Sequence, residues 1–513
     1  MNRLLHAMIF HPDERPRGWI RSLVFAGSKT PRKSMRRVVF KKNGALRPEF
    51  AAWIEAEAKP DAPWVFVPTA AADNPTHRFQ RMEEVIRPLE KTVTYWIRKD
   101  EPGTLLTPDA IRARLAGAGA GWLAVSIGHD DYVNVPGGVQ VCIQREERAV
   151  VGAGGHYLNL HPWQPLPRLA HAGEDPDPLV DLVLDGEAAG TARMSDVTAA
   201  LEAEAVAGRT VQTVIHHLMG HGSEAVADLV RRVSGGKCLL WLHDFFTLCT
   251  SFALQRNDMA FCNAPSVSSN ACSFCLYGDE RSSQMVRMRA FFDALEVQVV
   301  APSQVTLEFW KNRAGDLPVS GGVVQPHAWL DWADKADGKT ATGPVVVAFT
   351  GTAAPHKGWP LFQRAVRQLK ADKGLKFRVF GSADPKLAGA RWIDVNTRAQ
   401  APNAMTRALA KEGVDLVIHW PRWPETFSLT TYEAFAGGAY VVTNAISGNV
   451  AAVVRETGRG VILEDEADLF AFLTDGRAAA LAEQARADRA ERTATTRLSD
   501  VSLPLLSAGG ATA

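Results

Sequence analysis

The sequence predicts an α/β protein with two Rossmann-like domains, in which parallel strands alternate with helices. Short apolar runs alternate with segments of helical period over residues 121–330, and the same alternation returns over residues 344–475. The length of 513 residues also exceeds what one ordinary core accommodates. Two large domains with additional material follow from these observations.

Composition and charge exclude several classes of protein. The chain is 46% hydrophobic and 22% charged, as soluble globular proteins are, and its net charge of +1 argues against a nucleic-acid binder. No apolar run approaches the ~18 residues that span a bilayer, and the first residues lack a secretory apolar region. We therefore expect a cytoplasmic protein. Six cysteines are too few for a disulfide scaffold and favour free thiols or a metal.

Residues 1–58 contain a basic repeat of 15 residues with Phe10, Phe25 and Phe40 at one phase. Residues 1–54 hold 12 Lys/Arg against 3 Asp/Glu, so the positive charge of the chain is concentrated there. Short amphipathic helical turns of this composition suit contact with an anionic inner membrane leaflet, as in a peripheral protein. The alternative is that they pack on the protein itself or on a partner.

Residues 59–120 are predicted to form an additional α/β segment, ending in a helix that opens at residue 107. The first Rossmann-like domain, residues 121–330, begins with a strand over 122–128 and a helix over 139–151. Gly137 and Gly138 lie between them, where glycine lets the backbone approach a phosphate or a sugar closely. A plain turn explains the same pair.

Histidines follow two strands of this domain. One strand ends in His216 and His217, with His221 shortly after, and the strand one helix later ends at His243. Because ligands of parallel sheets collect at the carboxyl ends of strands, His243 is predicted to hydrogen-bond a ligand hydroxyl or to order a second substrate. The alternative is a structural histidine satisfied by its neighbours.

Four cysteines follow directly, with a final spacing of Cys-x-x-Cys. They are Cys249, Cys262, Cys272 and Cys275. Four thiols of this kind hold a structural zinc ion in many irregular loops, so the sequence predicts one here. Buried free cysteines are the alternative. The loop leaves the strand beside His243, so we expect it to shape the substrate side of the domain.

The second domain, residues 344–475, opens with a strand over 345–349, after a polar interdomain connection over 331–343. A loop containing Gly351, Thr352 and Lys357 follows, and a later strand ends at Gly381. Residues 476–513 are predicted to form a helix that crosses back and then a flexible tail.

Residues 415–443 form a compact predicted unit of strand, helix and strand, and the rest of the domain is arranged around it. Glu425 precedes the helix, and Glu433 lies one to two turns inside it. Two carboxylates placed in this way suit a ligand rich in hydroxyl groups, because an ionised carboxylate accepts two O–H donors. The alternative is a helix-dipole partner and a solvated surface residue.

The string around Glu425 and Glu433 resembles the Glu-x7-Glu segment of retaining glycosyltransferases of family four, which have the GT-B fold of two facing Rossmann-like domains. The resemblance implies that Glu425 contacts the donor sugar, Glu433 the nucleotide ribose and Lys357 the diphosphate. It also implies a donor-side place for further loop residues, namely Gly137, Gly138, Gly351, Gly381, Thr426, Phe427 and Ser428. Thr352 stands where the family has an arginine, which weakens the diphosphate site.

By resemblance, the chain transfers a sugar from a nucleotide diphosphate sugar to a glycan or lipid-linked acceptor in bacterial surface-polysaccharide synthesis, with its anomeric configuration kept. Glu425, His243 and Lys357 are the predicted catalytic residues, and catalysis is expected to need no cofactor. A non-catalytic nucleotide-sugar-binding scaffold of a membrane-associated glycan assembly complex is the alternative that the missing arginine and the basic repeats favour. The base, the sugar and the acceptor stay open.

Overall fold

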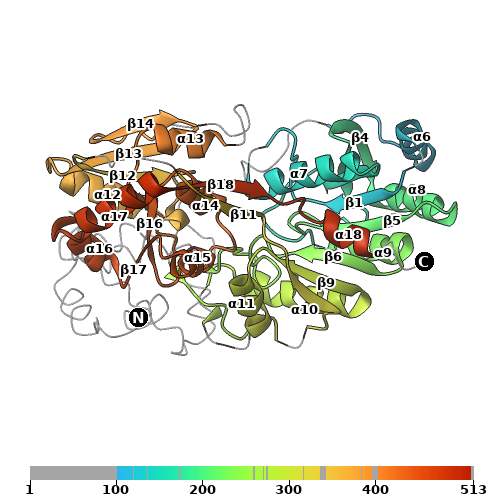
Figure 1. The fold of residues 1–513 in the computed structure, drawn as a ribbon. Coiled ribbons are helices and arrows are strands. Elements are labelled where there is room, and N and C mark those ends of the chain that lie inside the picture. Colours follow the sequence, from blue (N-terminus) through green and yellow to red (C-terminus); the bar gives the residue numbers. More distant parts are fainter. Residues whose placement is uncertain are drawn as a thin grey trace.

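The computed structural model describes residues 101–509, apart from 120, 136, 172, 174, 258–259, 268, 270, 273–274, 316, 336–341, 383 and 396–402. The basic repeats over 1–58 and most of the segment over 59–120 lie outside the described residues. Two α/β domains lie side by side, one coloured cyan to olive and the other orange to red (Figure 1). The predicted fold class, two facing Rossmann-like domains, is confirmed.

The first domain is built on an eight-stranded sheet of order β10-β9-β6-β5-β1-β2-β3-β4. All its neighbouring strands are parallel except β3, which pairs antiparallel with both β2 and β4. The strands are β1 Leu123–Ile127, β2 His156–Pro162, β3 Leu179–Leu184, β4 Glu187–Arg193, β5 Val211–Ile215, β6 Lys237–Trp241, β9 Glu296–Ala301 and β10 Gly321–Val324.

Helices cover both faces of this sheet. They are α6 Pro108–Ala118, α7 Gly138–Gly152, α8 Met194–Val206, α9 Ser223–Ser234, α10 Gly278–Ala294, α11 Gln304–Ala314 and α18 Leu503–Gly509. Alternate residues of β1 belong to two different core clusters, one on each face of the sheet, because successive side chains of a strand point to opposite faces. Leu123, Val125 and Ile127 pack with α6, α8, α9, α10 and α11, whereas Ala124 packs with α7 and with Leu506 of α18.

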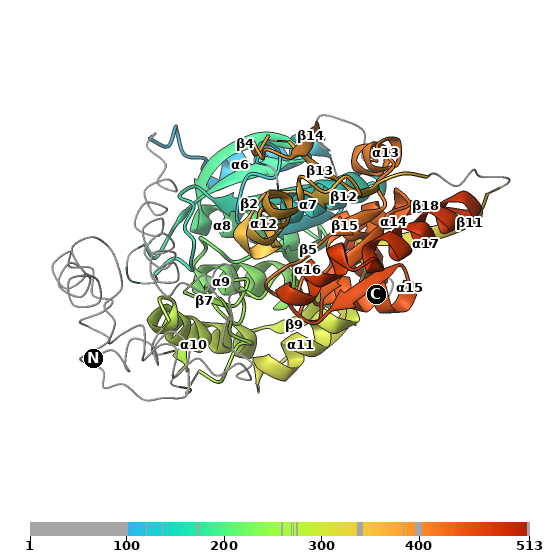
Figure 2. The same ribbon diagram turned by 90° about the vertical axis from the view of Figure 1, so that its left-hand side faces the viewer.

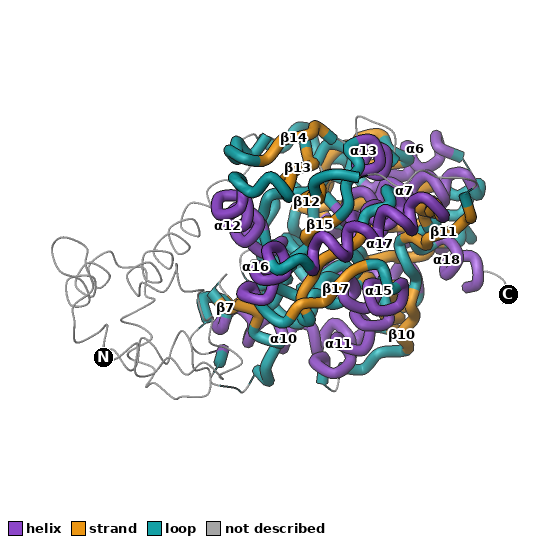
Figure 3. Tube along the Cα trace, turned by 60° about the vertical axis from the view of Figure 1, so that its left-hand side comes forward, coloured by secondary structure: helices purple, strands orange, loops and turns teal. Residues whose placement is uncertain are grey.

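The second domain has a six-stranded, all-parallel sheet of order β14-β13-β12-β15-β16-β17. Its strands are β12 Val345–Thr350, β13 Leu375–Gly381, β14 Ala390–Asp394, β15 Leu416–Ile418, β16 Tyr440–Asn444 and β17 Gly460–Leu463. Its helices are α12 Trp359–Leu369, α13 Ala404–Lys411, α14 Leu429–Ala436, α15 Asn449–Thr457, α16 Glu466–Thr474 and α17 Arg477–Glu491. Figure 3 distinguishes these helices and strands by colour. The predicted unit over 415–443 corresponds to β15, α14 and β16.

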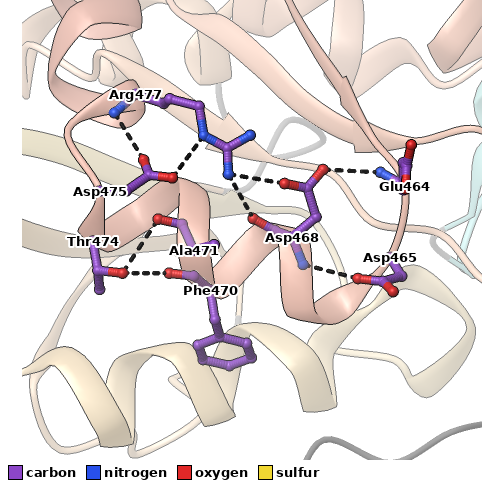
Figure 4. Close-up of polar contacts among 8 residues, drawn as sticks. All are labelled: Glu464, Asp465, Asp468, Phe470, Ala471, Thr474, Asp475 and Arg477. Atoms are coloured by element: carbon purple, nitrogen blue, oxygen red, sulfur yellow. Dashed lines mark hydrogen bonds and ion pairs between the residues drawn. The ribbon is translucent and has the colours of Figure 1, made fainter.

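Short local interactions define where the last helices begin. Asp465 caps α16 by accepting a hydrogen bond from the amide of Asp468 at 2.8 Å. Arg477, the first residue of α17, donates to Asp468 and to Asp475, each at 2.8 Å (Figure 4). These pairs are solvent-exposed, so they determine the turn between the helices more than they add to stability.

The two domains are joined twice. Strand β11, Ala328–Asp334, leaves the first domain and pairs antiparallel with β18, Arg492–Leu498, which returns from the second (Figures 1 and 2). Residues 331–334 therefore lie in a strand and not in a polar linker. The predicted C-terminal helix and tail also contain β18 and α18, because β18 pairs with β11 and the buried Leu506 of α18 packs in the core of the first domain.

Within the described part of the chain, none of the helices combines the length and the apolar character that a membrane crossing requires. The predicted membrane contact through residues 1–54 falls outside the described residues and stays a prediction.

Asp415, immediately before β15, is 1% exposed and holds the last long helix on the sheet. Its carboxylate accepts from Arg486 at 2.6 Å and from Arg489 at 3.0 Å. We expect Asp415→Ala to lower the free energy of unfolding of the second domain by about 3–5 kcal/mol, because it leaves the buried Arg486 without its counter-charge. Asp331→Ala, which breaks an exposed pair with Arg497, should cost less than about 1 kcal/mol. Denaturant unfolding followed by tryptophan fluorescence tests both, and equal losses would contradict the assignment.

Candidate functional site

The carboxyl ends of the two sheets meet at the domain junction, which is where open parallel sheets place their ligands. From the first domain, the carbonyl of His243, after β6, accepts a hydrogen bond from the hydroxyl of Thr426 at 2.7 Å. Ser303, after β9, donates its hydroxyl to the carbonyl of Thr426 at 2.8 Å. Thr426 therefore fixes the loop after β15 against two strand ends of the other domain.

Glu425 lies beside this contact and is 5% exposed. Its Oε1 accepts from the indole N–H of Trp423 at 3.1 Å and lies 3.5 Å from Nζ of Lys357. Nε2 of His419 is 4.0 Å away. Burial opposes ionisation of this carboxyl, but the charge of Lys357, followed by His419, lowers its pKa to about 2. Glu425 is therefore a buried carboxylate at neutral pH.

The backbone of Glu425 is positioned by the loop after β16. Glu425 forms a parallel bridge with Gly448, and the amide of Asn449 donates to the carbonyl of Glu425 at 2.9 Å. The side chain of Asn449 donates to the carbonyl of Phe427 at 3.0 Å. Gly448 has a φ of +63°, and a Cβ there would lie 2.6 Å from the carbonyl oxygen of Glu425. Only glycine permits this approach.

Lys357 is held toward Glu425 by a similarly tight turn. It ends the short 3-10 helix Pro355–Lys357, and the next residue, Gly358, has a φ of +84°. A Cβ at Gly358 would lie 2.2 Å from the carbonyl oxygen of Trp420, so the turn packs directly on the strand end that carries His419. The predicted neighbourhood of Lys357 and Glu425 is therefore present in the structure.

Other basic residues near Lys357 bear on the missing arginine. Burial, followed by the charge of Lys357, lowers the pKa of His356, so this histidine is neutral at neutral pH. The amide of Arg422 donates to the carbonyl of His356 at 2.8 Å, which places Arg422 beside the same loop. Thr352 is exposed and carries no charge. Lys357 is thus the cation that the structure places beside Glu425, while the backbone of Arg422 lies against the same loop.

Glu433 lies in the second turn of α14 and is partly buried. Within the described residues, its carboxyl group forms no ion pair and no side-chain hydrogen bond. Burial alone raises its pKa to about 7. A carboxylate that accepts no hydrogen bond from the protein can accept hydrogen bonds from the hydroxyl groups of a ligand.

The glycines predicted on the donor side divide into two groups. Gly351, after β12, and Gly381, at the end of β13, lie together, because a Cβ at Gly381 would be 3.1 Å from the carbonyl oxygen of Gly351. A Cβ at Gly351 would in turn be 3.6 Å from Thr430 in the first turn of α14. Gly137 and Gly138 lie at the start of α7, and no hydrogen bond among the described residues joins them to the Glu425 loop. Their ligand contact stays a prediction.

The side chains of residues 426–428, just before α14, already contact other parts of the protein. The Thr426 hydroxyl binds the other domain, and the buried Phe427 ring stacks on Tyr432 at 4.4 Å. Ser428 has a φ of +71°, and its hydroxyl lies 3.0 Å from that of Thr431. These contacts explain the shape of the loop, while the predicted nucleotide contacts of the three residues stay predictions.

His243 belongs to a hydrogen-bonded chain that sequence reasoning did not find. Its Nε2 lies 2.9 Å from Nδ1 of His216, whose Nε2 lies 2.9 Å from the carboxylate of Glu146. Burial opposes ionisation of Glu146, but His216 and hydrogen bonds from Ser502 and Tyr157 lower its pKa. One proton arrangement that fits these distances has Nε2–H of His216 donating to Glu146 and Nε2–H of His243 donating to Nδ1 of His216, which leaves Nδ1 of His243 as an acceptor.

One group of metal-ligating side chains lies close to this chain. Among the described residues, only Cys142, His243 and His327 bring three ligand atoms within 4.8 Å of one another. Burial raises the pKa of the Cys142 thiol to about 12, and desolvation lowers the pKa of His327 to about 3. The rings of Trp241, His243 and His327 stack at 5.0–5.3 Å, so this group forms a packed layer. The four cysteines of the predicted zinc site line a different cavity.

Comparison with known families gives one match. Residues 331–492 match the family described as glycosyl transferases group 1. The match covers the second domain, including all of α17, together with the last residues of β11, and thus includes Lys357, Glu425 and Glu433. The predicted class of enzyme, a glycosyltransferase, is confirmed by it. No curated protein sequence matches the chain.

Solved structures with a similar fold include HepE from Anabaena in complex with UDP and glucose, with 13% identity and a TM-score of 0.44 over 76% of this chain and 99% of that one. WaaG, a glycosyltransferase involved in lipopolysaccharide biosynthesis, has 14% identity and a TM-score of 0.41 over 76% and 99%. An α,α-trehalose-phosphate synthase (UDP-forming) from Burkholderia vietnamiensis has 11% identity and a TM-score of 0.41 over 71% and 92%.

The close approach of Gly448 to Glu425 predicts a local effect of substitution. We expect Gly448→Ala to speed amide hydrogen exchange over residues 421–427, because its Cβ forces the Glu425 backbone away. Gly458→Ala is the matched control: it ends the same helix with a φ of +65°, but its Cβ would meet no atom within 4 Å. Exchange in the 421–427 segment that is unchanged in Gly448→Ala, or equally fast in both variants, would contradict this account of the loop.

Proposed function

We propose that the protein is a retaining glycosyltransferase that moves a hexosyl or related residue from a nucleoside diphosphate sugar to a hydroxyl of a glycan or lipid-linked acceptor. The observation that carries the proposal is the buried carboxylate of Glu425, held 3.5 Å from Lys357 where the carboxyl ends of two parallel sheets meet. A carboxylate and an ammonium so placed match a ligand that carries hydroxyl groups at one end and phosphate at the other.

A donor of this kind can replace the Lys357–Glu425 pair without leaving either charge unpaired. Its diphosphate forms an ion pair with the ammonium group of Lys357, and a sugar hydroxyl donates a hydrogen bond to the carboxylate of Glu425. Arg422 and the first-turn amides of α14 add to the positive field around the diphosphate. The exchange is balanced, which matters because a buried charge that loses its partner costs several kcal/mol.

Glu433 supports the nucleoside end of the same ligand. It lies eight residues after Glu425, one to two turns into α14, and the described residues give its carboxyl group no partner. A ribose supplies two adjacent O–H donors, which one carboxylate can accept together. Gly351 and Gly381 leave space for the nucleotide beside the start of α14, because neither carries a side chain.

In the proposed step, the acceptor oxygen forms a bond to the anomeric carbon on the face from which the phosphate oxygen departs. The acceptor proton passes to that phosphate oxygen, so no side-chain nucleophile is needed. The protein orients the two substrates and stabilises charge on the leaving diphosphate through Lys357. In this proposal, His243 binds the acceptor hydroxyl through a hydrogen bond to its Nδ1.

Removal of the Glu425 carboxylate should abolish most of the activity. Nucleoside diphosphate sugars are first screened by thermal shift, and the donor that stabilises the protein is then used radiolabelled. We expect Glu425→Ala to lower kcat/KM by roughly 10²–10³-fold, as loss of a preorganised polar contact does. Asp331→Ala is the surface control. A wild-type protein that binds the donor and never cleaves it would support a scaffold instead, and full activity in Glu425→Ala would refute the assignment.

The raised pKa of Glu433 predicts a pH dependence of donor binding. The ionised form accepts the ribose hydroxyls, so donor affinity should rise as the pH increases through about 7. The same ionisation costs stability, since the folded-state pKa lies above the unfolded value, so the apo protein should lose stability between pH 4.5 and 7. Titrations at pH 6 and pH 8 with wild type and Glu433→Gln test this, because the variant should show a flat profile. A pH dependence of donor affinity that persists in Glu433→Gln would show that another group causes it.

We further propose that the acceptor belongs to surface-polysaccharide synthesis and that residues 1–54 contact the inner face of the membrane. The 12 basic residues of this segment favour anionic lipid. Deletion of residues 1–54 should reduce flotation with vesicles containing phosphatidylserine, and raising the salt concentration should reduce flotation of the full chain. Equal flotation of both chains, or binding to neutral vesicles alone, would contradict this.

A further inference from the structure

We propose that Cys249, Cys262, Cys272 and Cys275 bind one structural zinc ion. All four line a single cavity in the first domain, between the end of β6 and the start of α10. The remaining cysteines, Cys142 and Cys238, do not line this cavity. Four sulfur ligands from one irregular segment are the set that tetrahedral structural zinc prefers. This site is independent of the donor site around Glu425.

The cavity also contains a buried cation that requires negative charge. Arg281 is 4% exposed, and its guanidinium donates to Sγ of Cys272 at 2.8 Å and to the carbonyl of Leu248 at 2.9 Å. Within the described residues, Arg281 forms no ion pair with a carboxylate. Because an isolated buried charge is costly, the sulfurs around it are the available counter-charge. Four thiolates on one Zn²⁺ carry a net charge of −2, which supplies it.

The sulfur of Cys272 accepts a hydrogen bond from the guanidinium of Arg281 at 2.8 Å. Hydrogen bonds of this kind orient metal ligands and stabilise their charge.

Zinc binding would displace four thiol protons to solvent and form four Zn–S bonds of about 2.3 Å. Sulfurs around such an ion lie roughly 3.8 Å apart, whereas no three of these four sulfurs lie within 4.8 Å of one another here, so binding would draw the side chains inward. The turn from Cys272 to Cys275 is already tight, because the amide of Cys275 donates to the carbonyl of Cys272 at 3.1 Å.

The ion would brace the segment that faces the donor domain. This segment contains the small hairpin of β7, Gln255–Arg256, and β8, Ala260–Phe261. The side chain of Gln255 donates to the carbonyl of Arg422 at 3.2 Å, and Phe245 meets Trp423 edge to face at 6.1 Å. These contacts reach the loop that leads into Glu425. A zinc ion would therefore fix one side of the domain junction without taking part in the reaction.

The test is the metal content of the full-length protein, purified without an affinity tag and measured by mass spectrometry of the elements. We expect about one zinc per chain in the wild type. Cys272→Ser and Cys275→Ser should each lose it, whereas Cys238→Ser should retain it. Cys142→Ser separates this site from the Cys142, His243 and His327 group, and it should also retain zinc.

A second measurement on the wild type does not depend on folded variants. Titration with a mercurial reagent should release zinc, detected with a chromogenic chelator, in step with the modification of four thiols. Zinc at trace level only, zinc that survives both Cys272→Ser and Cys275→Ser, zinc that is lost in Cys142→Ser, or disulfides among the four cysteines in the purified protein would each overturn the proposal.

Discussion

A buried carboxylate is stable only where the protein compensates its charge, and the loop that carries Glu425 is built around that requirement. Lys357 supplies the opposite charge, Trp423 supplies a hydrogen bond, and two glycines permit the backbones to come close enough. The loop is then fixed against the other domain through Thr426.

The first domain presents a second compensated carboxylate to the same junction. Glu146 binds His216, which binds His243, and the amide of Ser502 completes the set from the other end of the chain at 3.1 Å. Since β18 and α18 cross back from the second domain, the position of His243 depends on the C-terminal segment as well as on its own strand. The crossing therefore connects the C-terminal segment with the hydrogen-bonded chain that ends at His243.

Local patterns were sufficient to predict the strand, helix and strand around Glu425, because its apolar runs, glycine stop and helix period agree with one another. The nearness of Lys357 and Glu425 was expected from the resemblance to family-four glycosyltransferases, which assigns both residues to one ligand, and the two lie 3.5 Å apart. Glu146 could not be predicted, since a glutamate within a helix usually faces solvent, and its burial depends on Ser502, which is 356 positions away. The order of residues 492–498 was missed for a similar reason: β18 pairs with a strand more than 150 residues earlier.

The central claim is that Glu425 contacts the transferred sugar and not the nucleotide. Calorimetric titration of wild type and Glu425→Gln, with the nucleoside diphosphate and with its sugar conjugate, tests this most directly. The account predicts that the variant binds the conjugate roughly 10–100-fold more weakly, as loss of a charged hydrogen bond requires. The nucleoside diphosphate should bind equally well or more tightly, because Lys357 is released. Equal weakening of both ligands, or of neither, would contradict the account.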